Sequence, residues 1–164
     1  MEQPVQVRRA RPQDGPRILE LERELASFEK LRGPDEGEGE RLLRWVFDER
    51  RFVCLVAERG GEIVGLALFF FLPTSFRARE ALYLEDLVVS ESARSSGTGS
   101  ELFREICREA IARDCLSIEW AVLDWNVRAI QFYRSLGAAP HAQWDRYTMP
   151  ETRMREIASS SPRS

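Results

Sequence analysis

Histidine and cysteine are scarce in this chain of 164 residues, and their scarcity removes several kinds of chemistry. The one histidine, His141, lies late in the sequence, with no serine, cysteine or aspartate arrangement around it that would form a catalytic triad. The three cysteines, Cys54, Cys107 and Cys115, are odd in number and widely spaced. Neither a disulfide framework nor a metal site is therefore expected, and we predict buried or half-buried thiols.

Long apolar runs and an excess of positive charge are also missing. The longest apolar stretch, residues 63–73, is shorter than the roughly 18 residues that a membrane helix needs. The first residues include Glu2 and three arginines and lack the apolar segment of a secretory signal, so a cytoplasmic location is expected. The formal net charge of −3 argues against nucleic acid as a partner.

The composition is that of a globular protein, with 43% hydrophobic and 31% charged residues. Periodicity predicts the order β-α-α-β-β-β-α-β-α-β, which is an α/β domain with a mixed sheet. The predicted strands include Val5 and Val7 and then residues 52–58, 62–71, 82–89, 117–123 and 144–149. The predicted helices follow the apolar positions Ile18, Leu21, Leu25 and Phe28, then Leu42, Leu43, Val46 and Phe47, then Leu102, Phe103, Ile106, Ala110 and Ile111, and finally residues 127–136.

The segments between and after these elements also carry predictions. Residues 33–40 alternate glycine with acidic residues and predict a flexible loop. Gly60 and Gly61 predict a two-residue hairpin turn, and Gly137 predicts the end of the last helix. We expect one domain over residues 1–150 and a loose tail over 151–164.

A turn rich in glycine and serine joins a buried strand to an amphipathic helix. It reads Arg94, Ser95, Ser96, Gly97, Thr98, Gly99 and Ser100. Free N–H groups and the positive end of the helix dipole at such a turn favour a phosphate. A Rossmann turn is excluded because Leu102 stands where a small residue is needed, and a P-loop is excluded because its Lys-Ser/Thr pair is absent. Alone, the string is also compatible with an ordinary strand-to-helix loop.

The strand before this turn reads Tyr-Leu-Glu-Asp-Leu-Val-Val at residues 83–89, and Trp-Asn, Phe-Tyr and Gly-Ala follow at 125–126, 132–133 and 137–138. Together with Arg-x-x-Gly-x-Gly, these residues resemble the GNAT superfamily of acetyltransferases, and most of all its diamine (spermidine/spermine) and thialysine N-acetyltransferase branch. The similarity runs from about Val7 to Met149. It implies a mostly antiparallel mixed sheet flanked by helices, acetyl-CoA as the donor without a metal, a small primary amine as the acceptor, and a homodimer.

The resemblance also assigns residues to the donor. It implies that Leu87, Val88 and Val89 pair with the pantetheine arm, that residues 94–100 hold the pyrophosphate, and that Asn126 and Ala129 contact CoA. Ser95 departs from the family pattern, in which this position is a glycine. If its backbone must adopt a positive φ, the serine costs about 1 kcal/mol.

Acetyl transfer to an amine requires two proton transfers, because the amine must lose a proton and the leaving thiolate must gain one. Tyr133 matches the general acid of the family, and it lies seven residues after Asn126, on the same side of one helix. The alternative is that Tyr133 is a core aromatic with a polar tip. Glu85 is expected to be the base, acting through water, or an anchor for the amine, with a pKa raised by partial burial. Asp86 should point to the opposite face as a structural acceptor.

For the acceptor amine, the resemblance indicates four residues besides Glu85, namely Phe28, Glu29, Glu119 and Trp120. Arg77 and Arg79 precede the Glu85 strand and favour a thialysine-like amino acid, with its carboxylate, over a long polycation. Two other functions stay open at this point. One is a catalytically weak acyl-CoA-binding regulatory module, and the other is a protein or peptide N-acetyltransferase.

Overall fold

The computed structural model describes residues 4–160, and the chain divides into two compact parts, Met1–Leu123 and Asp124–Ser164. The first part contains one sheet with the strand order β1-β2-β3-β4-β5. Its strands are β1 (Gln6–Arg9), β2 (Val53–Arg59), β3 (Glu62–Thr74), β4 (Arg79–Val89) and β5 (Ile118–Glu119). Neighbouring strands are antiparallel except β4 and β5, which are parallel. The prediction of a mixed, mostly antiparallel sheet is therefore confirmed.

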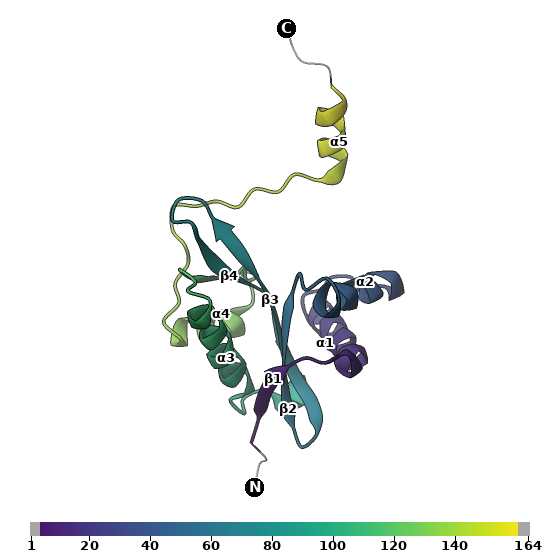
Figure 1. The fold of residues 1–164 in the computed structure, drawn as a ribbon, viewed down its shortest axis with the longest axis vertical. Coiled ribbons are helices and arrows are strands. Elements are labelled where there is room, and N and C mark those ends of the chain that lie inside the picture. The colour runs from purple at the N-terminus through teal and green to yellow at the C-terminus, as the bar shows by residue number, and fades with distance from the viewer. Residues whose placement is uncertain (1–3, 161–164) are drawn as a thin grey trace. The chain divides into compact units, whose positions relative to one another are not determined.

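Helices cover both faces of this sheet. The first part has α1 (Gly15–Phe28), α2 (Glu36–Phe47) and α3 (Thr98–Ala112), together with the short turns η1 (Pro12–Asp14) and η2 (Glu91–Ala93). Figure 1 shows α1 and α2 on one side of the strands and α3 on the other. Within residues 4–160 no helix is both long enough and apolar enough to cross a membrane.

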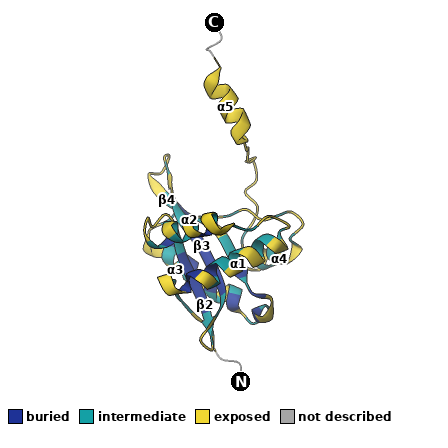
Figure 2. Cartoon of the chain, turned by 90° about the vertical axis from the view of Figure 1, so that its right-hand side faces the viewer, coloured by how far each residue is buried: buried dark blue, intermediate teal, exposed yellow. Residues whose placement is uncertain are grey.

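The three central strands, β2, β3 and β4, contribute buried side chains to both faces of the sheet because most of their residues are apolar. Alternate side chains meet α1 and α2, where the core consists of Ile18, Leu21, Val46, Cys54, Val56, Leu66, Leu68 and Val88. On the α3 side the helix contributes the buried residues Leu102, Phe103, Ile106 and Ala110. Figure 2 shows this burial concentrated in the strands. Ile111, the last of the apolar positions that predicted this helix, is 79% exposed near the end of α3.

The hairpin between β2 and β3 turns at Gly60 and Gly61, as predicted. Their φ angles are 61° and 84°. Two successive residues with positive φ match the type I′ turn, whose twist suits two antiparallel strands.

The beginning of α2 corrects the prediction of a flexible acidic loop. Asp35 Oδ1 accepts a hydrogen bond from the Glu38 N–H at 2.9 Å, and Glu38 Oε2 accepts one from the Asp35 N–H at 2.9 Å. This reciprocal pair is a capping box, and it satisfies two N–H groups at the helix start. Acidic residues in the first turn also suit the positive end of the helix dipole. Residues 36–40 are therefore helical.

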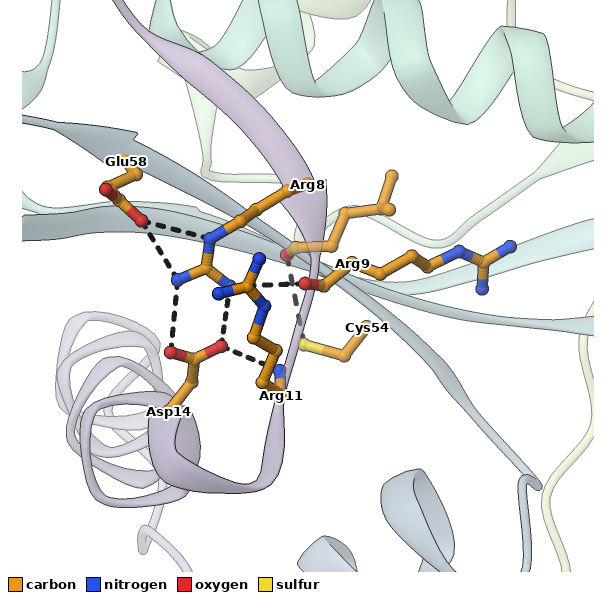
Figure 3. Close-up of polar contacts among 7 residues, drawn as sticks. Arg8, Arg9, Arg11, Asp14, Cys54 and Glu58 are labelled. Carbon is orange, nitrogen blue, oxygen red and sulfur yellow. Dashed lines mark hydrogen bonds and ion pairs between the residues drawn. The ribbon is translucent and has the colours of Figure 1, made fainter.

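An arginine on β1 ties the first strand to β2 and to the turn η1. Arg8 Nη1 lies 2.7 Å from Asp14 Oδ2, and Arg8 Nε donates to Glu58 Oε2 at 3.0 Å (Figure 3). Asp14 is 6% exposed and also accepts from the Arg11 N–H at 2.7 Å. The charge of Arg8 lowers the pKa of Asp14, and the two carboxylates raise the pKa of Arg8. The side chain of Arg8 thus fixes the edge strand of the sheet.

The second part contains α4 (Val127–Ser135) and α5 (Glu151–Ser159). The end of α4 agrees with its prediction: Gly137 has a φ of 87°, and its N–H donates to the Arg134 carbonyl at 3.0 Å. The Ala138 N–H donates to the Tyr133 carbonyl at 3.1 Å, which completes a Schellman motif.

Two predictions about the last third of the chain are wrong. The fifth strand is limited to Ile118–Glu119 instead of residues 117–123, because only two residue pairs join it to β4. Residues 144–149 form no strand, and all six are exposed, since none of the described strands pairs with them. Within the predicted tail, residues 151–159 form α5, whose residues are all exposed. Within it, Arg155 Nη2 lies 2.5 Å from Glu151 Oε1, one turn away.

Candidate active site

The middle of β4 contains an irregularity at Glu85. Leu84 pairs with Phe69 of β3 and Asp86 pairs with the preceding residue, Leu68, so Glu85 is the extra residue of a β-bulge. The bulge interrupts the alternation of side chains along the strand. As a result Glu85 is exposed, so the predicted partial burial is wrong.

The next residue, Asp86, is half-buried. Asp86 lies opposite Leu68, and directly opposed residues point to the same face, so Asp86 faces α1. Burial and, to a smaller extent, the negative charges of Glu85 and Glu29 together raise the pKa of Asp86 to about 7. No hydrogen bond to the Asp86 carboxyl is present within residues 4–160, so its predicted role as a structural acceptor is also wrong.

A second half-buried carboxyl, that of Glu22, projects from α1 into the same region. Its Oε1 atom is buried and has no hydrogen-bond partner among the described residues. Burial raises the pKa of Glu22 to about 8, with further contributions from the charges of Asp86, Glu85 and Glu29. Burial also raises the pKa of the nearby Cys54 thiol to about 12, and Glu22 adds to that shift. Around neutral pH, Glu22 and Asp86 therefore carry less than two full negative charges.

Glu22 was missed in the sequence although a signal for it exists. It lies four residues after Ile18 and three before Leu25, both of which face the core, so helical spacing places it on the same stripe. An acidic residue within an apolar stripe is rarely buried without a reason.

The end of α1 contacts the beginning of the glycine- and serine-rich turn. The Arg94 guanidinium carbon lies 5.6 Å from the centre of the Phe28 ring, and Arg94 Nε donates to the Val89 carbonyl at 3.1 Å. Glu29 follows Phe28 as the C-cap of α1, and burial raises the pKa of its carboxyl. The structure therefore brings two predicted acceptor residues, Phe28 and Glu29, close to the predicted donor loop.

The glycine- and serine-rich turn contains two residues with positive φ, and one of them is the serine at position 95. Ser95 has a φ of 65° and Gly97 a φ of 82°, so a serine does occupy a left-handed position. Gly97 is the N-cap of α3, and no side chain caps this helix. Gly97 also has open space where a Cβ would lie. The amino end of α3 therefore presents backbone N–H groups and the positive end of the dipole to a ligand.

The remaining predicted donor residues on β4 continue the strand beyond the bulge. Leu87 lies opposite Ala67, Val88 opposite Leu66, and Val89 opposite Gly65.

Two predicted acceptor residues lie on and after β5. Trp120 packs edge-on against Phe103 of α3, with ring centres 5.6 Å apart, and so contacts the helix on the opposite face of the sheet from α1. Glu119 is exposed and accepts a hydrogen bond from the Ser117 hydroxyl at 2.9 Å. Trp120 therefore packs against α3, the helix that follows the glycine- and serine-rich turn. It does not lie beside the carboxyls of Glu22 and Asp86, which are on the α1 side of the sheet.

In the second part, α4 carries the other predicted residues. Asn126 is its N-cap, and Asn126 Oδ1 accepts from the Ala129 N–H at 3.2 Å, as its residue type indicated. Tyr133 is half-buried, and its ring centre lies 5.4 Å from that of Phe132.

No group of histidine, cysteine, aspartate or glutamate side chains that would hold a metal occurs in the part of the chain that the structure describes.

Known proteins resemble this chain in sequence and in fold. A sequence model described as the acetyltransferase (GNAT) family matches residues 17–138. Thialysine N-epsilon-acetyltransferase of Bos taurus is 35% identical over 166 residues, which cover 94% of this chain and 97% of that protein. Spermidine/spermine N(1)-acetyltransferase-like protein 1 of Homo sapiens is 35% identical over 141 residues, covering 81% of this chain and 20% of that protein.

Solved structures agree on the fold. The crystal structure of a possible acetyltransferase from Clostridium difficile 630 has a TM-score of 0.79 at 19% identity, and it covers 89% of this chain and 97% of that one. The resemblance inferred from the sequence motifs is therefore confirmed. The chain is an acetyltransferase that belongs to the GNAT family.

Proposed function

We propose that this acetyltransferase moves the acetyl group of acetyl-CoA directly to a primary amine of a small molecule. The acceptor is a diamine, a polyamine or a thialysine-like amino acid. The names of two relatives, a thialysine and a spermidine/spermine-like acetyltransferase, support this class. The observation that carries the proposal is the layout of β4, which exposes Glu85 at its bulge and leads through η2 to the uncapped amino end of α3.

The residues present fit acetyl-CoA. A pyrophosphate requires N–H donors and positive potential, and the amino end of α3 offers both without a side-chain cap. Open space above Gly97 leaves room for phosphate oxygens at the backbone. Val88 and Val89 lie at the end of β4 and would hold the pantetheine arm, while Asn126 and Ala129 of α4 would contact the rest of CoA. Bound there, acetyl-CoA supplies the activated acetyl group.

Two side chains handle the protons. Glu85 takes a proton from the acceptor ammonium through a water, so that the amine nitrogen can form its bond to the acetyl carbon. Tyr133 gives its phenolic proton to the sulfur as the carbon–sulfur bond breaks. The second proton leaves the nitrogen as the amide forms and restores the phenol of Tyr133, so the products are an amide and a free thiol. Being exposed, Glu85 is also accessible to a cationic acceptor.

The neighbouring carboxyls of Glu22, Glu29, Glu85 and Asp86 favour a cationic acceptor. The two arginines noted in the sequence favour an acceptor that has a carboxylate at the end away from its reacting amine. Glu29 and Glu85 lie near the half-buried Asp86, whose pKa they raise, and their charges attract an ammonium group. Arg79 has an ion pair with Asp114 at 2.6 Å, so of the two arginines noted in the sequence it is Arg77, which is exposed, that we assign to an acceptor carboxylate.

Release of free thiol from acetyl-CoA tests the proposal. Putrescine, spermidine, spermine, lysine, thialysine and a basic peptide serve as acceptors, with Tyr133→Phe and Glu85→Gln in parallel. We expect release with one class of small amine and a loss of about 10²-fold or more in kcat for each variant. Release with the peptide alone would contradict the small-molecule acceptor. Equal rates in Tyr133→Phe and the wild type would exclude Tyr133 as the acid.

We further propose that the enzyme is a cytoplasmic homodimer, as the resemblance implies. Light scattering coupled to size-exclusion chromatography tests the assembly, and a mass of one chain at micromolar concentration would contradict it.

A further inference from the structure

A residue outside the glycine- and serine-rich turn is bonded to its centre. Arg59, the last residue of β2, donates from Nη2 to Ser96 Oγ at 2.5 Å and to Thr98 Oγ1 at 3.0 Å. These two hydroxyls flank Gly97, the N-cap of α3. Arg59 therefore connects the end of β2 to the point where the loop becomes a helix.

The protons of both hydroxyls are already used within the protein. Ser96 Oγ donates to the Ala93 carbonyl at 2.6 Å. In the 3.1 Å contact between Ser96 Oγ and Thr98 Oγ1, the donor must then be Thr98. Neither Ser96 nor Thr98 has a hydroxyl proton left for a phosphate, so these side chains shape the loop while its backbone N–H groups face the ligand.

The loop needs such an external anchor because it includes a strained residue. Ser95 adopts a φ of 65°, which costs a residue with a Cβ about 1 kcal/mol or more. A strained conformation persists only when neighbouring contacts fix it. On one side, Arg94 is bonded to the Val89 carbonyl, and on the other, Ser96 is bonded to Ala93 and Arg59.

The charge of Arg59 also indicates what kind of ligand completes the loop. Thr98 is the first residue of α3 and is 1% exposed, so its partner Arg59 places a guanidinium at the positive end of that helix dipole. A cation is unfavourable at a helix amino end, whereas an anion is favourable there. The first turn contains one acidic residue, Glu101, which forms an ion pair with Arg104. An anionic ligand at the loop therefore offsets both the dipole and the guanidinium.

We propose that Arg59 is a positioning residue for the donor's pyrophosphate, holding the loop around Ser95 in its binding shape through the hydroxyls of Ser96 and Thr98. This inference rests on the proposed use of acetyl-CoA. Arg59 acts on the diphosphate part of the donor and not on the acetyl group or the acceptor. Its loss should therefore change donor affinity while leaving turnover at saturation nearly intact.

Kinetics with two donors test this role. Acetyl-CoA carries the pyrophosphate, and S-acetyl-pantetheine lacks it. For Arg59→Met, which keeps the stem but removes the charge and the donors, we expect KM for acetyl-CoA to rise about tenfold with kcat within about twofold. With S-acetyl-pantetheine, kcat/KM should match the wild type. A similar fall with both donors, or no change with either, would overturn the proposal.

Arg9→Met is the matched control. Arg9 also joins a strand to α3, through an ion pair with Glu109 at 2.6 Å, but eleven residues beyond the helix start. It should leave KM for acetyl-CoA unchanged, and a tenfold rise there would mean that any strand-to-α3 contact produces the effect.

A second set of variants keeps the test decisive if Arg59→Met does not fold. Arg59→Lys retains the charge and should give a KM between the wild type and Arg59→Met. Ser96→Ala removes one acceptor, and Arg59→Lys combined with Ser96→Ala should be little worse than the poorer single variant because both act on one anchor. Effects that multiply would contradict a shared role.

Calorimetry with CoA itself separates this inference from the proposed function. If the wild type binds CoA but acetylates no amine, the proposed function fails while Arg59 is still tested by its effect on CoA affinity. If the wild type turns over and the Arg59 variants bind CoA as tightly as it does, the inference alone fails.

Discussion

Glu22 and Asp86 show how one backbone irregularity changes the chemistry of single residues. The bulge at Glu85 exposes that carboxylate and turns Asp86 toward α1, where Glu22 is also half-buried. Each half-buried carboxyl has a pKa above that of an ordinary acid, so the folded protein binds protons more tightly there than the unfolded chain does. The stability that these groups contribute is therefore full at acidic pH and is lost as the pH rises.

Replacement of Glu22 by leucine should remove much of this pH dependence. The pKa of Glu22 is about 8 in the fold against an ordinary value of 4.5, so the wild type should lose free energy of unfolding between about pH 4.5 and pH 8. Glu22→Leu should flatten that decline and be more stable than the wild type at pH 8 by about 1–3 kcal/mol. Urea unfolding at pH 5 and pH 8 measures both.

The control for this experiment lies on the same helix. Glu20 is an acid whose side chain is 59% exposed, so Glu20→Leu should keep the pH slope of the wild type. Parallel curves for the wild type and Glu22→Leu would show that Glu22 does not carry the pH dependence.

Arg8 gives the opposite pH dependence. Arg8→Met leaves the carboxylate of Asp14, 6% exposed, with the Arg11 N–H as its remaining hydrogen-bond donor, and should cost about 3–5 kcal/mol at pH 7. Because the pKa of Asp14 is lowered in the fold, its contribution is full above the ordinary value of 3.8 and is lost as the pH falls below it. The loss in Arg8→Met should therefore shrink below about pH 4.

The control is Arg9→Met. The Arg9 side chain is 55% exposed, so its replacement should change the free energy of unfolding by about 0.5 kcal/mol or less. An equal loss in both variants would contradict the special role of Arg8.

At the scale of elements, the pairing of β3 with β4 depends on Gly65 of β3, which lies opposite Val89 at the end of β4. A Cβ on Gly65 would lie 2.8 Å from the Val88 carbonyl oxygen and 3.3 Å from Leu102 Cδ1. Gly65→Ala must therefore push β4 away at the residues proposed to hold pantetheine. We expect a loss of about 1–3 kcal/mol in the free energy of unfolding and weaker CoA binding. Thermal melts and calorimetry measure the two effects.

A glycine in the adjacent hairpin provides the comparison for Gly65. Gly61 has a φ of 84° and nothing within 4 Å of a built Cβ, so asparagine, which tolerates this conformation, should fit there. Gly61→Asn should leave CoA affinity unchanged. If Gly65→Ala binds CoA as well as Gly61→Asn does, the close approach of β3 to β4 is not needed for the donor site.

At the scale of the whole molecule, local signals were predictable and pairing between distant segments was not. The turn at Gly60 and Gly61 and the cap at Asn126 depend on a few neighbouring residues, and both agree with the structure. The capping box of Asp35 and Glu38 was equally local, but the glycines around it indicated a loop. Residues 144–149 have the composition of a strand and no partner, and the bulge at Glu85 depends on the register with β3. The burial of Asp86 followed from that register and was therefore beyond sequence reasoning.

The C-terminal boundary provides the last prediction. No residue of α5 is buried, and its ion pairs join neighbours on the same helix, such as Arg153 with Glu156 at 2.9 Å and Arg155 with Glu151 at 2.5 Å. Surface pairs of this kind add little to stability, and no apolar area is buried that removal would expose. Deletion of residues 151–164 should therefore leave the melting temperature within about 2 °C and the rate of acetyl transfer unchanged. A larger drop in either, with the same mass by light scattering, would show that the domain extends past residue 150. A drop that accompanies a change from dimer to monomer would instead assign α5 to the contact between two copies, because its exposed Met154 and Ile157 would then be covered.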